Sequence, residues 1–78
     1  MDMRRDILKA VQGGEKVMNK ILNRAAIQWM PGKQLVDDLV DQGCLERRKT
    51  SASRYVYYIT GEGLKALETY ERVATYIE

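Results

Sequence analysis

Residues 35–59 read LVDDLVDQGCLERRKTSASRYVYYI, and the spacing of their apolar residues changes from helical to alternating at Gly43. Before that glycine, apolar residues recur every three or four positions, as on one face of a helix. After it come a short run, 44–48, and a run rich in β-branched and aromatic residues, 54–59, on either side of the polar segment 49–53. This order predicts a helix that stops at Gly43 and is followed by a two-stranded β-hairpin.

Helices are predicted on both sides of this region. Apolar residues recur at helical spacing up to Gly13-Gly14, where glycine favours a helix end, and again over residues 17–25. Because Pro31 is tolerated only in the first turn of a helix, the third helix is expected to begin near residues 28–31 and to end near Gln42. Thr60 is a good N-cap for a long last helix. The fold class is therefore α+β and mostly α, with one domain over residues 1–78.

This combination resembles the winged helix-turn-helix regulators. Residues 35–48 resemble the recognition helix, glycine stop and first wing strand of these proteins. Residues 57–63, YYITGEG, are similar to the second wing strand and its capped exit into the last helix. PadR-like and MarR-like regulators and small archaeal or viral winged-helix proteins carry this pattern. The resemblance implies a three-helix core with a two-stranded wing, and double-stranded DNA as the partner.

The charge of the chain is concentrated where the wing is predicted. The net charge is +2, but residues 47–58 contain four basic residues and no acidic one. A helix fits the major groove with its N-terminal residues near the base edges, and a basic hairpin beside it can contact phosphates. Gln34 is suited to adenine, and Lys33 to guanine or a phosphate. The residues expected to contact DNA are Gln28, Trp29, Lys33, Gln34, Arg47, Arg48, Lys49, Ser51 and Arg54, with Met30 and Ser53 beside them and Lys16, Lys20 and Arg24 flanking the groove.

Several of these residues have a second interpretation. Trp29 is expected to pack in the core or a turn rather than to stack on bases. Tyr55 and Tyr57 are expected to pack under the wing, and Cys44 is expected to be buried. The methionines Met3, Met18 and Met30 are expected to fill gaps in the core or turns. Three carboxylates on the third helix, Asp37, Asp38 and Asp41, would repel phosphates, and they favour the alternative that the domain binds proteins and not DNA.

The last helix is expected to mediate dimerisation. Residues 60–78 would span about 27 Å at about 1.5 Å per residue, longer than a three-helix core needs. The surplus apolar stripe predicts a homodimer, and the alternative is that the helix folds back onto the first helix of its own chain. The residues expected at the dimer seam are Leu67, Tyr70, Val73, Ala74 and Ile77.

Composition argues against other classes of protein. The chain has no histidine and one cysteine, so the commonest general base and the commonest zinc ligand are both missing. We therefore expect no enzymatic activity, no metal, no cofactor and no small-molecule substrate. No apolar run approaches the ~18 residues of a membrane span, so no membrane partner is expected. A lone cysteine fits a reducing, cytoplasmic setting.

Overall fold

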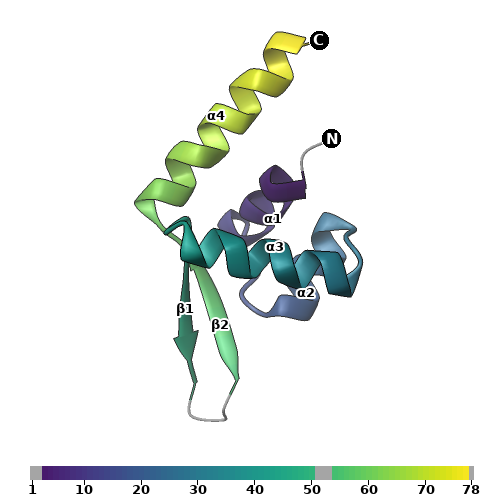
Figure 1. The fold of residues 1–78 in the computed structure, drawn as a ribbon, viewed down its shortest axis with the longest axis vertical. Helices are drawn as coiled ribbons and strands as arrows, with labels where there is room; N and C mark the ends of the chain where they lie inside the picture. Colours follow the sequence, from purple (N-terminus) through teal and green to yellow (C-terminus); the bar gives the residue numbers. More distant parts are fainter. Residues whose placement is uncertain (1–2, 51–53, 78) are drawn as a thin grey trace.

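Four helices and one antiparallel hairpin make up the computed structural model, which describes residues 3–50 and 54–77 (Figure 1). The elements are α1 (Met3–Gln12), α2 (Met18–Ala25), α3 (Trp29–Asp41), β1 (Leu45–Lys49), β2 (Tyr55–Ile59) and α4 (Gly61–Ile77). The predicted order of three helices, a hairpin and a last helix is confirmed. The hairpin β1–β2 is called the wing below.

The core lies where α1, α2 and α3 meet, and the base of the wing and the first half of α4 close it. The pairing of Leu45 with Ile59 places the apolar end of the wing against the helices. Cys44 is buried, as expected, and burial raises the pKa of its thiol. The buried side chains are Ile7, Leu8, Ala10, Val11, Ile21, Leu22, Val36, Leu39, Cys44, Leu45, Tyr57 and Leu67.

The joint between α3, the wing and α4 is fixed by backbone geometry. Gly43 ends α3 with a φ of 79°, a conformation that favours glycine. The Thr60 hydroxyl accepts a hydrogen bond from the Gly63 amide at 3.0 Å and donates one to the Gly43 carbonyl at 2.5 Å. The predicted N-cap is therefore confirmed, and the same hydroxyl also fastens the start of α4 to the end of α3. A Cβ at Gly63 would lie 2.0 Å from the Cys44 carbonyl oxygen, so this crossing requires glycine.

The turn between α2 and α3 is similarly tight, which the sequence did not predict. Ala26 has a φ of 56°, in the left-handed region, and its amide donates to the Asn23 carbonyl at 3.2 Å. A Cβ at Gly32 would come within 2.6 Å of a methyl carbon of Leu22, so α2 and α3 pack closely at that point.

The wing and α4 project in opposite directions from the helical core (Figure 1). α4 runs past α1, and the Lys9 ammonium lies 3.7 Å from the Glu71 carboxylate. The Tyr57 amide of the wing donates to the Lys16 carbonyl at 2.9 Å, which ties β2 to the segment before α2. The surface around α3 and the wing is therefore well separated from the far end of α4.

Candidate nucleic-acid interface

The start of α3 and the wing share one surface. A groove of about 410 Å³ lies between the beginning of α2, the first turns of α3 and strand β2. Trp29 and Lys33 of α3 line it together with Arg54 of the wing. Two segments that are far apart in the sequence, and that were both predicted to contact DNA, are thus brought together. The residues that line the groove are Val17, Met18, Asn19, Trp29, Lys33, Arg54, Tyr55 and Tyr57.

A second hollow of about 340 Å³ lies along α3. Its residues are Trp29, Met30, Lys33, Gln34, Asp37 and Asp38. Lys33 and Gln34 are exposed, as a base-reading role requires, and Gln28 is exposed at the N-cap of the helix. Asp37 and Asp38 lie one turn further along, so α3 is cationic near its start and anionic near its middle.

The arginines of the wing are held by partners within the molecule. Arg47 lies 3.5 Å from the Asp37 carboxylate and over the ring of Tyr55, 5.0 Å from its centroid. Arg48 pairs with Glu46 at 2.9 Å and lies over the ring of Tyr58. These contacts place two guanidinium groups in defined positions, and one of them partly neutralises the acidic middle of α3.

The cations of the wing are divided between its two faces. The strand register pairs Arg47 with Tyr57 and Lys49 with Tyr55, and side chains alternate along a strand. Arg47 and Lys49 therefore lie on the face that includes the groove, whereas Arg48 lies on the other face. Burial raises the pKa of Tyr57, although a hydrogen bond from Arg47 and its positive charge oppose this shift.

Several expectations about individual side chains are wrong. Tyr55 was expected to pack under the wing, and Trp29, Met3 and Met30 in the core or in turns. Trp29, Tyr55 and Met3 instead expose about half of their surface, and Met30 is 77% exposed. Trp29 is the first residue of α3 and lies outside the core. Tyr55 lies at the end of β2 that is away from the base of the wing. Tyr57 and Met18 do pack against the core.

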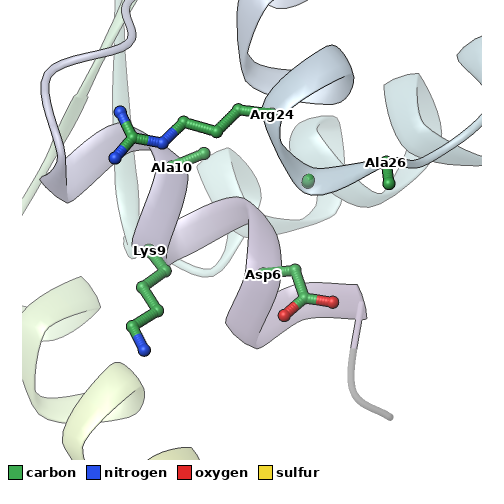
Figure 2. A pocket seen from close by; sticks show the side chains of 6 residues that line it. Asp6, Lys9, Ala10, Arg24 and Ala26 are labelled. Atoms are coloured by element: carbon green, nitrogen blue, oxygen red, sulfur yellow. The ribbon is translucent and has the colours of Figure 1, made fainter.

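Arg24 lies away from the groove between α2, α3 and the wing. Its guanidinium lies 3.4 Å from the Gly13 carbonyl and 3.9 Å from Glu15, on the side of the molecule formed by α1. There it lines a separate hollow with Asp6 and Lys9. The charged ends of these three side chains point away from one another in Figure 2. The hollow therefore has no converging set of polar groups. Lys16 lies over the ring of Tyr58, 5.3 Å from its centroid, on the face of the wing that does not include the groove, and Lys20 is exposed.

Some predicted positions lie outside the described residues. Ser51 and Ser53 of the wing are among them. The side chains of Val73, Ala74 and Ile77 on α4 also lie outside. Leu67 is described, and it is only 3% exposed and belongs to the core, so its expected place at a dimer seam is corrected. Tyr70 packs partly against the same core.

Sequence reasoning missed one part of the site, the contribution of α2 and Tyr55 to the groove. Val17, Met18 and Asn19 begin α2, and they were assigned only to a helix pattern. The sequence signal that could have placed Tyr55 in the groove was the alternation of side chains along β2, because Tyr55 shares a face with Arg47 and Lys49.

Within residues 3–50 and 54–77, no cluster of acidic, cysteine or histidine side chains is suited to a metal ion. No helix of those segments is long and apolar enough to cross a bilayer.

Three helices closed by a hairpin, with the start of the third helix beside the hairpin, define the winged-helix class. A family model described as winged helix-turn-helix matches residues 1–78. The chain belongs to this family. No match is found among curated proteins.

Solved structures with low sequence identity share the fold. The transcriptional regulator BldR from Sulfolobus solfataricus has a TM-score of 0.83 at 23% identity, over 96% of this chain and 55% of BldR. Sso10a-2, a DNA-binding protein from Sulfolobus solfataricus, has a TM-score of 0.77 at 22% identity, over 96% of this chain and 80% of Sso10a-2. BpsR from Bordetella bronchiseptica has a TM-score of 0.86 at 14% identity, over 99% of this chain and 57% of BpsR. The chain thus spans about half the length of BldR and BpsR.

Proposed function

We propose that this protein binds double-stranded DNA as a transcription regulator and has no catalytic role. The first half of α3 enters the major groove, and the wing contacts the phosphates alongside. The observation that carries the proposal is the shared groove in which Lys33 of α3 and Arg54 of the wing lie on one surface. The descriptions of BldR as a transcriptional regulator and of Sso10a-2 as a DNA-binding protein support the same function.

Within this interface, each kind of residue has a separate task. Gln28, Lys33 and Gln34 are exposed at the start of α3, where side chains can reach base edges. Arg47, Lys49 and Arg54 supply charge to the phosphates from the wing, with Arg48 on its other face. Phosphate contacts fix the orientation of the protein and base contacts provide its sequence preference. Trp29 lies at the junction of the two groups.

Binding of random duplex DNA at low salt, measured by gel shift, tests this proposal. The double variant Arg47→Ala/Arg48→Ala should weaken binding and make it less sensitive to salt, because the slope falls by about 0.9 for each phosphate that is no longer neutralised. The matched control is Lys65→Ala/Arg72→Ala, which removes two exposed positive charges from α4. The proposal fails if the wild type does not bind, or if both double variants change affinity equally.

The proposal includes a homodimer formed through α4. In Figure 1 this helix extends away from the wing beyond the helical core. The sequence places Val73, Ala74 and Ile77 on its last turns, where an apolar stripe favours a second copy as partner. A two-fold dimer presents two copies of α3 to a pseudo-palindromic site. Sedimentation at micromolar concentration should report twice the mass of the 9.0 kDa chain, and a 9.0 kDa species would refute the dimer.

A second candidate function is a protein–protein interaction module. It is favoured by Asp37 and Asp38, which lie in the same hollow of α3 as the highly exposed Met30. The ion pair between Arg47 and Asp37 reduces the charge that this face would present to a phosphate. The same gel shift separates the two candidates, because an interaction module has no affinity for duplex DNA at low salt.

A further inference from the structure

Two exposed aromatic rings lie in the groove between α2, α3 and the wing, and contact with base edges and phosphates of a duplex leaves the faces of these rings unused. Trp29 and Tyr55 each expose 48% of their surface, and both line the groove. One comes from the start of α3 and the other from the far end of β2. Large aromatic side chains that stay exposed in a shared hollow are typical of binding sites.

The chemistry around the rings is apolar at one side and cationic at the rim. Val17 and Met18 provide the apolar part, and Lys33 and Arg54 provide positive charge. None of the described residues that line this groove is acidic, in contrast to the hollow along α3. A ligand that matches the groove therefore carries negative charge together with flat apolar surfaces.

Nucleotides with unpaired bases have this combination. Base faces stack on aromatic side chains, and the backbone phosphates interact with nearby cations. In a duplex, the base faces are covered by neighbouring pairs and only the edges reach the grooves. Trp29 and Tyr55 can therefore stack only on bases that are not in a duplex.

We propose that this groove binds a single-stranded segment of nucleic acid, with Trp29 and Tyr55 stacking on unpaired bases and Lys33 and Arg54 contacting the adjacent phosphates. The Arg47 guanidinium already covers one face of the Tyr55 ring, so a base stacks on the other face. This activity goes beyond duplex binding and does not depend on it. Because Trp29 and Lys33 belong to both surfaces, a single strand and a duplex compete for the protein.

The wild-type chain offers a direct probe, since Trp29 is its only tryptophan. Titration with a 12-nucleotide oligothymidylate at low salt should quench the Trp29 fluorescence to a saturating value. When the complex is formed with a labelled oligothymidylate, a 12-base-pair duplex added at saturation should displace the labelled single strand. The same titration with oligouridylate shows whether the backbone is DNA or RNA, and binding of either strand supports the groove.

Substitutions in the groove test whether the single strand binds there. Followed by anisotropy of a labelled oligothymidylate, Trp29→Ala and Tyr55→Ala should each weaken binding about tenfold, or about 1.4 kcal/mol, the lower part of the range for one stacked base. Trp29→Phe should restore most of the affinity. The controls are Met30→Ala, next to Trp29 but outside the groove, and Tyr58→Ala, on the other face of the wing. Both should change affinity less than twofold, with circular dichroism confirming that every variant is folded.

The outcomes separate this inference from the proposed function. If oligothymidylate and oligouridylate both fail to bind while duplex binds, the inference is overturned and the duplex function stands. If the single strand binds and duplex does not, the duplex function falls and the groove stands. Equal effects of Tyr55→Ala and Tyr58→Ala, or binding without any change in Trp29 emission, would also overturn the inference.

Discussion

The Asp37 carboxylate and the Arg47 guanidinium lie 3.5 Å apart and join the middle of α3 to strand β1 of the wing. The two residues belong to regions of opposite charge, the acidic part of α3 and the basic wing. Arg47 is held further by the Tyr55 ring beneath it. The pair therefore both orients the wing against α3 and reduces the negative charge beside the proposed DNA surface.

Replacement of Asp37 tests the electrostatic part of this relationship. Asp37→Asn should raise the affinity for duplex DNA about threefold at low salt, because it removes a charge that repels phosphates. The free energy of unfolding should change by less than about 1 kcal/mol, since the ion pair is exposed. Asp41→Asn is the control, because it removes the same charge from the end of α3 and should have a smaller effect. Weaker duplex binding by Asp37→Asn would show instead that the carboxylate positions Arg47 for contact.

Gly63 should not tolerate any side chain. Gly63→Ala brings a Cβ within 2.0 Å of the Cys44 carbonyl oxygen, and backbone cannot move aside as a flexible side chain can. We expect a loss of about 3 kcal/mol, at the upper end of the usual cost of overpacking. Gly61→Ala is the matched control, because nothing lies near its Cβ position, and it should change stability by less than about 0.5 kcal/mol. Thermal unfolding of the two variants decides the matter, and equal melting temperatures would contradict the crossing geometry.

The Thr60 hydroxyl should matter more than an ordinary helical threonine. Thr60→Val removes the acceptor of the Gly63 amide and the donor to the Gly43 carbonyl, at a cost of about 1–2 kcal/mol. For a domain of this size, each kcal/mol corresponds to about 4–8 °C in the melting temperature. Thr69→Val is the control, since the Thr69 hydroxyl bonds only to the Lys65 carbonyl within α4. A similar loss in both variants would mean that the N-cap is not what holds α4 to α3.

Stability should fall at alkaline pH. Burial raises the pKa of the Cys44 thiol, with a further contribution from Glu62, and burial also raises the pKa of Tyr57. The folded state thus retains both protons where the unfolded chain has begun to lose them, from about pH 8.5 for cysteine and about pH 10 for tyrosine. The stabilisation is complete below these values and is lost as the pH rises. In melting curves between pH 7 and 10.5, Cys44→Ala should remove the earlier part of the decline, and a wild-type melting temperature that stays constant would contradict this.

The order of elements was predictable because each boundary has a local chemical cause. Gly43 and Thr60 set their boundaries by backbone conformation and by a side-chain cap, and both act within a few residues. The burial of Tyr57 followed from alternation along β2, and that of Cys44 from the apolar character of a lone cysteine. Local pattern was therefore sufficient for the helices and the wing.

The parts that were mispredicted depend on contacts between distant segments. Nothing in the sequence around Trp29 shows that α3 begins outside the core, because that depends on how α3 packs against α1, α2 and the wing. Alternation alone places Arg47 and Arg48 on opposite faces of the wing, but which of the two shares a face with Tyr55 and the groove depends on the strand register. The pairing of Arg47 with Asp37 depends on how the wing meets α3, which no spacing encodes. Leu67 was assigned to a dimer because the helix pattern does not distinguish a core face from a seam.

The most direct test of the account is nuclear magnetic resonance mapping of a short duplex onto the protein at low salt. If α3 and the wing form the DNA surface, the backbone amide signals that shift should belong to residues 28–30, 32–34, 47–49 and 54–55. Signals of the exposed face of α4 between residues 62 and 72 should stay unchanged. Shifts confined to α4 or α1, or no shifts at duplex concentrations well above that of the protein, would contradict the central claim.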